Sequence, residues 1–451
     1  MQRRPAIPSP DGSEPRPPEQ RTRDSGPAPN AGEGAAPGSS PDRPNRAYSI
    51  FFFEGWVGVA PTVINLTTML GELGSQVTIY GTRNPYQAPP SMGENARVLY
   101  LRRPEDFPGG RFVFRMLRRL RLGSALPGIE LLVFACQCWI ASAFTRAGCS
   151  VRMGPSIGVD TMGSIVAMFR RMATGKRYAY LSFEFRDVDR TRLLSWFVNP
   201  LERAAYRRAD FVVIQDRDRL RTLERYLRFE HPNVIFLPNA PRASAGRRTA
   251  PAEANFLRRR LSIDAAEFPV IVLSAGMIDP EVFSEEAASA FESVGHGAAL
   301  VYHERRKRTD GDPFIVALKE ANRRNLFLSL DPVSLDEVDL VYASATIGLA
   351  FYRESDASHT NVSMASGKIG QYLMHGKPLL VNRTESLGRF IDRTRVGVAV
   401  TDPTDGREID TAVGELLANY ATYSANARAY YEREMDFDRN AQRVIDALAK
   451  L

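Results

Sequence analysis

The sequence has little of the chemistry that holds disulfide-rich domains or metal sites together. It contains 3 cysteines and 5 histidines among 451 residues. Cys136, Cys138 and Cys149 lie close together with no second set to pair with, so no disulfide framework is expected and a reducing compartment fits better. No histidine lies near Cys136 or Cys138 in the sequence. A structural metal site at this pair is therefore not expected.

Long hydrophobic runs are also missing. Residues 1–4 are followed by prolines instead of the apolar segment of a signal peptide, so secretion is not predicted. The stretch 126–147 comes nearest to a membrane span, but Glu130, Gln137 and Thr145 interrupt it. It is predicted to be a buried or interfacial helix. We therefore expect a cytoplasmic protein, with peripheral association at the inner face of the membrane as an open alternative.

Positive charge is what the sequence has in excess. It contains 59 lysines and arginines against 52 acidic residues, a net charge of +7, with 44% hydrophobic and 25% charged residues. These proportions are typical of a globular protein. The basic balance suits a nucleic acid, an anionic membrane or a phosphorylated substrate. Paired zinc ligands and aromatic RNA-binding strands are absent from the sequence, so no nucleic-acid partner is expected.

The chain is too long for one ordinary core, and its composition divides it. Residues 1–46 hold 11 of the 30 prolines and almost no large apolar residue, so this tail is predicted to be disordered. From Tyr48, short apolar runs alternate with helical spacing as far as Pro238-Asn239. One of these runs, 178–185, is predicted to be a strand. This alternation predicts a parallel sheet in a first domain, 47–245.

Residues 240–262 lose this rhythm and are predicted to be the interdomain linker. A new alternation begins at Val270 and predicts a second domain, 246–425, followed by helices over 426–451 that pack back on the first domain. The predicted fold is therefore α/β, with two doubly wound Rossmann-like domains facing a cleft. Ligands of such domains bind at the carboxyl ends of the strands.

The segment 361–400 has the clearest functional pattern. Ser366-Gly367-Lys368 is expected to open a helix that ends at Gly376, directly before an apolar strand. A helix start presents unpaired backbone N–H groups and partial positive charge, and Lys368 adds a full charge. The arrangement suits an anion such as a diphosphate. An ordinary capped helix of an α/β domain explains the same residues and stays open as the alternative.

The spacing SGKxxxYLxxGKPxL, which begins at Ser366, resembles the donor-binding segment of family 4 glycosyltransferases, which have the GT-B fold. Residues 202–214, Leu237-Pro-Asn239 and 335–344 resemble further segments of that family in the same order. The resemblance covers about residues 47–445. It implies transfer of a sugar from a nucleotide-sugar to an acceptor, usually with retained anomeric configuration, without a metal and without a cofactor.

Two departures from the family pattern concern the donor site. Many members carry two glutamates separated by seven residues, at positions that match Ser363 and Gln371 here. Gln371 can still bond a sugar or ribose hydroxyl, but it is not an ionised acceptor. Many members also carry arginine and lysine after the first strand of the second domain, where this chain has 275–279 without a base. The missing charge is expected from Arg305, directly after the next strand.

On the donor side, the resemblance implies that fixed N–H donors and cations stabilise the leaving diphosphate. Lys368 and Arg305 are the candidate catalytic cations. The candidate donor-binding residues are Gly276, His303, Ser366, Gly367 and Gln371. A solvated basic loop is the alternative for Arg305, and a structural histidine is the alternative for His303.

On the acceptor side, Gly55, Trp56 and Gly58 form a loop that can approach a ligand closely because glycine lacks a side chain. A tight strand-to-helix turn is the alternative. Glu184 lies at an expected strand end where the family carries a polar residue near the reacting carbon. It can orient the acceptor hydroxyl or accept its proton, unless it only pairs with a neighbouring arginine. Asp160 is a similar strand-end candidate.

Three Asp-x-Asp pairs occur, at 187–189, 216–218 and 436–438. In GT-A glycosyltransferases, which have a different fold, such a pair after an apolar strand binds a metal and the diphosphate. Because the pattern recurs here, metal binding at Asp187 is not expected.

Residues 111–121 alternate arginines with large apolar residues. A basic amphipathic helix of this kind can lie on an anionic membrane, which would suit a membrane-bound acceptor. A packed helix with a solvated basic face is the alternative.

We predict a retaining, metal-independent glycosyltransferase that uses a nucleotide-sugar and a saccharide or lipid-linked acceptor, in cell-surface polysaccharide or glycolipid synthesis. A nucleotide-sugar epimerase of the same fold and a catalytically silent sugar-nucleotide-binding protein are the alternatives. The missing glutamate pair keeps the silent protein open.

Overall fold

The structure is a computed structural model. It describes residues 46–54, 57–83, 92–120, 126–147, 152–184, 192–242, 255–320, 323–334, 337–354 and 360–451. Residues 1–45 of the predicted disordered tail, Gly55, Trp56 and the Asp187–Asp189 pair lie outside the described residues, whereas Arg46, the last residue of that predicted tail, begins a strand.

The first domain is built on a parallel sheet whose described strands follow the order β3-β2-β1-β4-β5-β6-β7. Its strands are β1 (Arg46–Phe52), β2 (Gln76–Thr82), β3 (Ala96–Leu101), β4 (Arg152–Val159), β5 (Tyr178–Leu181), β6 (Phe211–Ile214) and β7 (Val234–Phe236). Its helices are α1 (Pro61–Glu72), α2 (Gly110–Arg119), α3 (Leu126–Ala147), α4 (Asp160–Thr174), α5 (Arg192–Arg208) and α6 (Arg217–Leu227). The predicted alternation of strands and helices is confirmed.

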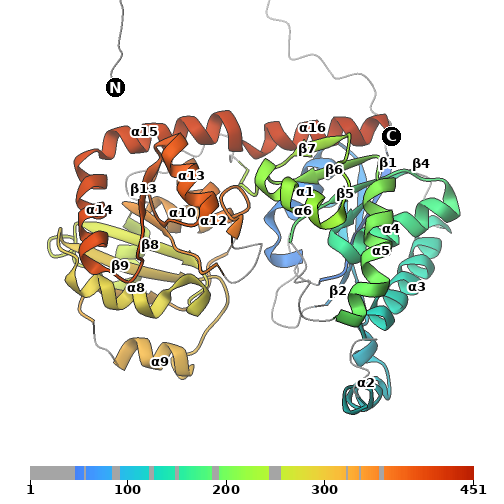
Figure 1. Cartoon of the computed structure of the whole chain (residues 1–451), viewed down its shortest axis with the longest axis horizontal. Coiled ribbons are helices and arrows are strands. Elements are labelled where there is room, and N and C mark those ends of the chain that lie inside the picture. Colours follow the sequence, from blue (N-terminus) through green and yellow to red (C-terminus); the bar gives the residue numbers. More distant parts are fainter. Residues whose placement is uncertain are drawn as a thin grey trace, which may run out of the picture. The chain divides into compact units, whose positions relative to one another are not determined.

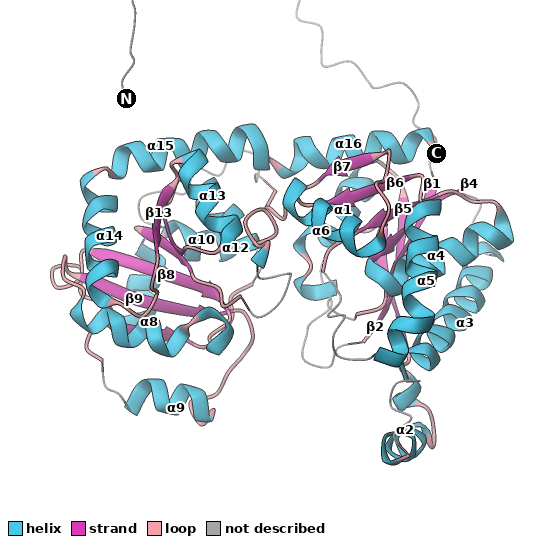
Figure 2. Cartoon of the chain, in the orientation of Figure 1, coloured by secondary structure: helices cyan, strands magenta, loops and turns pink. Residues whose placement is uncertain are grey.

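The second domain repeats this plan with the strand order β10-β9-β8-β11-β12-β13, again all parallel among the described residues. Its strands are β8 (Val270–Gly276), β9 (Ala298–Glu304), β10 (Leu326–Ser329), β11 (Ile347–Ala350), β12 (Leu379–Asn382) and β13 (Gly397–Val400). Its helices are α7 (Phe256–Leu261), α8 (Ser284–Ala290), α9 (Pro313–Glu320), α10 (Val338–Ala343), α12 (Gly367–Met374), α13 (Glu385–Thr394) and α14 (Gly406–Ala418). Helices cover both faces of each sheet (Figure 2).

Both faces of each sheet are apolar, which is why its strands are continuous hydrophobic runs. In β1, Ile50 and Phe52 join one core cluster. Phe51 joins the cluster on the opposite face, and so does Phe53, which directly follows the strand. The side chains of the second sheet also divide between two core clusters, and Leu273 belongs to one of them. Alternate side chains of a strand point to opposite faces, so both faces need a helical cover.

The chain ends with two helices, α15 (Tyr420–Tyr430) and α16 (Phe437–Lys450). Tyr430 belongs to the core of the second domain. Phe437, Ile445 and Leu448 of α16 belong instead to the core cluster that contains β1 and α1, and α16 lies beside the first sheet (Figure 1). The last helix therefore packs on the domain with which the described chain begins.

Two sequence expectations about element bounds are wrong. The strand predicted over 178–185 ends at Leu181, because the backbone N–H groups of Phe183 and Glu184 bond the side chain of Asp160 instead of a neighbouring strand. The predicted linker 240–262 already contains α7, whose buried Leu257 packs in the second core. Six residues are too few to give a recognisable helical period.

Among the described residues, no helix has both the length and the apolar character needed to cross a membrane.

Candidate functional site

The strand order of the second sheet reverses between β8 and β11, and ligands of open parallel sheets bind at such a point. Gly276 ends β8, Arg305 follows β9, and Tyr352 follows β11 at the same carboxyl edge. The start of α12 joins them there, because the Tyr352 hydroxyl lies 2.5 Å from Ser366 Oγ. The structure thus brings together the second-domain residues that the sequence singled out.

Ser366 caps α12, as the sequence predicts: its Oγ accepts a hydrogen bond from the Ile369 backbone N–H at 3.4 Å. The cap satisfies that single donor, so the other N–H groups of the first turn remain for an anion. A Cβ added at Gly367 would lie 3.5 Å from Asn239, which is an ordinary contact. An ordinary capped helix therefore explains the Ser366 bond but not the cation that follows it.

Lys368 is half-buried at this helix start, and its Nζ lies 4.5 Å from the centroid of the Tyr352 ring. Burial lowers the pKa of Lys368 to about 8; Arg305 acts in the same direction and the Asp279 carboxylate opposes it. A desolvated lysine held against an aromatic face is short of anionic partners. A diphosphate oxygen would supply one.

Arg305 lies on the turn that follows β9, directly beside the end of β8. Its backbone N–H bonds the Gly276 carbonyl at 2.7 Å, and its guanidinium Nη2 lies 3.3 Å from the Met277 sulfur. Gly276 has a φ of 127°, a backbone conformation that favours glycine over any other residue. Desolvation lowers the pKa of Arg305, with Arg306 acting in the same direction, and the carboxylates of Glu304, Glu184 and Asp279 oppose the shift.

The turn that carries Arg305 is held by Glu304, which the sequence analysis did not single out. This carboxylate is 3% exposed and accepts hydrogen bonds from three backbone N–H groups, those of Ile278, Arg305 and Arg306 at 3.0–3.2 Å. It therefore ties the loop after β8 to the turn after β9. In the sequence Glu304 adjoins a basic run, where a solvated ion pair is the ordinary expectation.

His303 is a buried residue near the end of β9, and its Nδ1 lies 2.9 Å from Ser329 Oγ. Burial, with Arg260 acting in the same direction, lowers the pKa of His303 to about 4. The imidazole is therefore neutral at pH 7. It can donate or accept a hydrogen bond, but it adds no charge to the site.

Ser363 and Gln371, which stand at the two glutamate positions of the family, lie on either side of the α12 start. Ser363 is buried. Gln371 Oε1 is also buried and has no hydrogen-bond partner among the described residues. A buried acceptor without a donor is costly, so this oxygen is suited to receive a ligand hydroxyl.

Asp160 and Glu184 come together at the carboxyl edge of the first sheet. Asp160 Oδ1 accepts the backbone N–H groups of Phe183 and Glu184 at 2.5 and 3.0 Å. Burial raises the pKa of the Asp160 carboxyl well above its usual range, with these two donors opposing the shift. The residue has a positive φ of 53° at the start of α4. The structure thus places Asp160 as a support for the exposed Glu184, which is not a role the sequence suggested.

Asn239 joins the end of the first domain to the donor segment. Its side chain bonds Thr62 Oγ1 of α1 at 3.1 Å and the Ala365 carbonyl at 3.0 Å, and its backbone N–H bonds the Met364 carbonyl at 2.9 Å. Gly58 lies in a short 3-10 helix, Val57–Val59, just before α1. Gly55 and Trp56, the rest of the predicted acceptor loop, are outside the described residues.

The Asp-x-Asp pairs that the structure describes cap helices. Asp216 accepts the Arg219 N–H at the start of α6, and Asp436 accepts the Arg439 N–H at the start of α16. No cluster of three or more metal-ligating side chains occurs in the described part of the chain.

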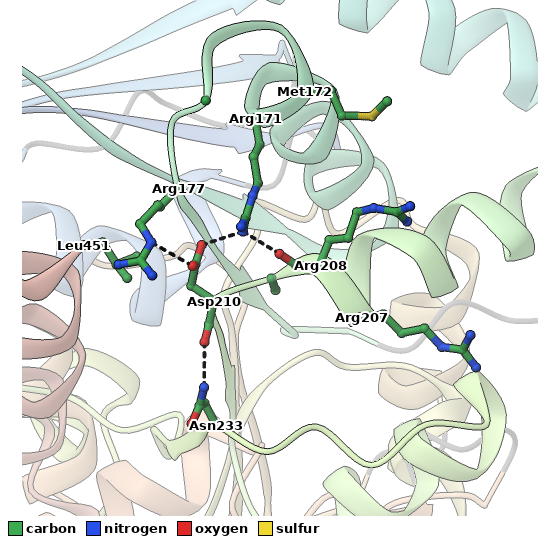
Figure 3. Close-up of a pocket in the computed structure, with 10 residues that line it drawn as sticks. Arg171, Met172, Arg177, Arg207, Arg208, Asp210, Asn233 and Leu451 are labelled. Carbon is green, nitrogen blue, oxygen red and sulfur yellow. Dashed lines mark hydrogen bonds and ion pairs between the residues drawn. The ribbon is translucent and has the colours of Figure 1, made fainter.

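A pocket of the first domain lies at the opposite edge of its sheet, where β5 and β6 begin (Figure 3). Arg171 and Arg177 each hold one carboxylate oxygen of Asp210, at 2.9 and 3.0 Å. Arg171 and Arg208 lie in the last turns of helices, where cations offset the helix dipole. The ion pairs with Asp210 and the positions at helix ends account for the presence of these arginines. The pocket lies away from the residues described above.

Residues 57–240 match the family model described as the glycosyl transferase 4-like domain. Residues 57–240 therefore form a glycosyl transferase 4-like domain, and the chain as a whole has the two-domain GT-B fold. The predicted fold class and family resemblance are confirmed. No curated protein matches the sequence.

Solved structures share the fold of this chain at low sequence identity. Sucrose-phosphate synthase from Thermosynechococcus elongatus is 14% identical with a TM-score of 0.61, over 90% of this chain and 98% of that one. WaaG, a glycosyltransferase involved in lipopolysaccharide biosynthesis, is 12% identical with a TM-score of 0.59, over 89% and 99%. Anabaena HepE in complex with UDP and glucose is 12% identical with a TM-score of 0.60, over 89% and 100%.

Three residues of the candidate site gave no usable signal in the sequence. Tyr352 follows a buried strand and looks like an ordinary core aromatic residue. Glu304 looks like a partner of the basic run beside it. Asn239 was noted only as part of a resemblance, and its hydrogen bonds to both domains could not be read from its position.

Proposed function

We propose that this protein is a glycosyltransferase that takes its sugar from a nucleotide-sugar bound at the second-domain site. The observation that carries the proposal is the position of Lys368, a desolvated cation in the first turn of α12, with Arg305 at the same edge. Departure of a nucleoside diphosphate develops negative charge, and cations fixed in advance lower the barrier to that step. The UDP and glucose found with HepE, which has the same fold, support this class of donor.

The remaining donor-side residues have roles that follow from their surroundings. Gly276 allows a close approach of the donor because it has no side chain. Neutral His303 offers a hydrogen bond to a sugar or phosphate oxygen. Gln371 Oε1 receives a hydroxyl of the ribose or of the sugar, which would satisfy its buried lone pairs.

The acceptor is a saccharide or a lipid-linked sugar that reaches the donor from the first-domain side. Glu184 is the candidate base or orienting group, because it is exposed at the carboxyl edge and Asp160 fixes its backbone. Gly55, Trp56 and Gly58 remain the proposed acceptor loop. Transfer with retained configuration and without a metal follows from the family resemblance and from the protein's own cations, and cell-surface polysaccharide or glycolipid synthesis is the proposed setting.

Thermal shift against a panel of nucleotide-sugars tests donor binding. A donor at one hundred times its dissociation constant should stabilise the fold by about 2.7 kcal/mol. The shift should disappear in Lys368→Ala, and radiolabelled sugar from the same donor should move to an acceptor in the presence of EDTA. Unchanged turnover in Lys368→Ala would remove the proposed site.

Three other outcomes separate the alternatives. Donor binding without turnover would make the protein a silent sugar-nucleotide binder, which the absence of the glutamate pair at Ser363 and Gln371 favours. Conversion of the nucleotide-sugar to its epimer without an acceptor would make it an epimerase. Loss of activity in EDTA with recovery in Mn²⁺ would contradict metal independence and direct attention to Asp187.

A further inference from the structure

Helix α2 exposes both its charges and its apolar side chains. Phe112 and Leu120, which directly follows the helix, are 67% and 59% exposed, Met116 is 43% exposed, and Phe114 is the buried residue of the helix. Its arginines are also exposed: Arg111, Arg115, Arg118 and Arg119. An ordinary surface helix buries its apolar face. This one buries Phe114 but leaves Phe112, Met116 and Leu120 exposed, so packing on the domain does not account for these three apolar side chains.

The helix is nevertheless held in a defined place. Gly109 has a φ of 77°, and a Cβ added at Gly110 would lie 2.0 Å from the Pro104 carbonyl oxygen. This close approach seats the start of α2 on the short helix η2 (Pro104–Asp106). Arg118 reaches Glu105 of η2 at 3.6 Å. The exposed residues of α2 therefore project from a fixed attachment.

Helix α3 presents a second exposed apolar surface beside it. Leu132, Trp139 and Ile140 are 64%, 49% and 59% exposed, at spacings that place them on one face of the helix. The opposite face is buried through Phe134 and Cys138. Both α2 and α3 contact η2, and α2 projects below α3 in the view of Figure 1.

A hollow between η2 and α2 carries three arginines. It is lined by Arg102, Arg111 and Arg115, by Phe107 and Phe112, and by two carboxylates that have partners of their own, since Glu105 pairs with Arg118 and Asp106 accepts the Arg103 N–H. Guanidinium groups bind phosphate oxygens through paired N–H donors, and aromatic rings favour the interface between water and lipid. The combination of arginines with exposed large apolar residues is complementary to anionic headgroups over acyl chains, and not to a solvated polar partner.

We infer that α2 and the exposed face of α3 form a docking surface for an anionic lipid bilayer, with a lipid phosphate between η2 and α2. The sequence predicted membrane contact through residues 111–121 alone, and the structure adds the exposed face of α3. Arg121 lies outside the described residues. Its use for bringing a lipid-linked acceptor to the enzyme rests on the proposed function, whereas vesicle binding does not. Because vesicle binding needs no turnover, the two can fail separately.

Co-sedimentation of the full chain with vesicles tests the surface. Vesicles of phosphatidylcholine with one third phosphatidylglycerol should bind the protein, and pure phosphatidylcholine should bind it weakly. The variant Arg111→Gln/Arg115→Gln/Arg119→Gln should lose about fivefold in binding for each charge. The variant Leu132→Ser/Ile140→Ser should also lose binding, and Trp139 fluorescence should shift to the blue with anionic vesicles and not in Trp139→Phe.

A matched control removes three exposed arginines elsewhere on the first domain, in Arg207→Gln/Arg208→Gln/Arg225→Gln. It should keep its binding to anionic vesicles. Because the two triple variants lose the same net charge, a difference between them reports the position of the arginines. Circular dichroism and melting temperature show whether each variant is folded. Equal loss in the control, or undiminished binding in the α2 and α3 variants, would overturn the inference. Concentration-dependent dimerisation that depends on Leu132 and Ile140 without vesicle binding would instead make this surface a contact between two copies of the chain.

Discussion

The Lys368 ammonium group lies 4.5 Å above the ring of Tyr352, whose hydroxyl is 2.5 Å from Ser366 Oγ, the cap of the same helix. One aromatic side chain thus places both the cation and the helix start. The ring face stabilises the ammonium group only in part, because the pKa of Lys368 is still lowered to about 8. A charged Lys368 in this environment lowers the stability of the folded protein, and ionisable groups with such a perturbed pKa are common at functional sites.

Lys368→Ala should lower the kcat/KM for the donor by about 100-fold, because a cation near developing phosphate charge is removed. The melting temperature should stay the same or rise, since a desolvated charge is lost with the side chain. Lys377→Ala is the matched control: burial also lowers the pKa of Lys377 to about 8, but its Nζ bonds the Ala343 carbonyl at 2.8 Å. This variant should keep its activity, and equal losses in both variants would contradict a donor role for Lys368.

The same lysine predicts the pH dependence of donor use. Lys368 is charged below pH about 8 and loses its proton above that value, so kcat/KM for the donor should be flat at pH 7 and fall above 8. The limiting slope should be about one decade per pH unit, because kcat/KM reports the ionisation of the free enzyme. Lys368→Arg should remove this fall. The free energy of unfolding changes with pH in the opposite direction. Because the pKa of Lys368 is lower in the folded than in the unfolded protein, the contribution of Lys368 to stability increases from pH about 8 to 10.

Glu304→Gln tests whether the basic turn is positioned by its neighbouring carboxylate. Glutamine replaces one acceptor oxygen by an NH2 group, so at least one of the N–H groups of Ile278, Arg305 and Arg306 loses its acceptor. The loss should cost about 1–3 kcal/mol in unfolding free energy. KM for the donor should rise more than kcat falls, because Arg305 is displaced and not removed. An unchanged KM in a folded variant would contradict the positioning role.

The repeating parts of this fold could be predicted from the sequence, because each is a local pattern. Helix α13 is an example of such a pattern, since Thr384 caps it and the apolar residues Leu387 and Phe390 lie on one buried face. The Ser366 cap was found for the same reason. Apolar runs predicted the strands, and their alternation with helices predicted two parallel sheets.

The supporting contacts of the site could not be predicted, because they join residues that are distant in the sequence through one bond each. Asp160 reaches Glu184 across 24 positions, and Glu304 reaches Ile278 across 26. Both are acidic residues that a sequence shows only as charge. Their effect depends on burial and on the direction of a backbone N–H group, which are properties of the folded chain.

Asp160→Ala should destabilise the first domain and impair Glu184, whereas Asp160→Asn should be close to the wild type. Asp160 Oδ1 accepts both backbone N–H groups, and the asparagine oxygen can take its place. Asparagine also tolerates the positive φ of 53° better than alanine does. The alanine variant should lose about 2–4 kcal/mol in a urea titration, combining the unmade hydrogen bonds with backbone strain. If asparagine were as harmful as alanine, the two hydrogen bonds to Oδ1 would not account for the role of Asp160.

Gln371→Met separates donor binding from stability in a single variant. The buried Oε1 of Gln371 has no partner among the described residues, so an apolar side chain of similar length should leave the free protein equally stable or stabilise it by about 1 kcal/mol. The donor-induced rise in melting temperature should shrink, because the hydroxyl acceptor is gone. Gln371→Glu should do the reverse: an ionised carboxylate without a donor destabilises the free protein, and a donor hydroxyl then binds it more strongly. Parallel changes of stability and donor response in both variants would mean that Gln371 supports the helix and does not contact the donor.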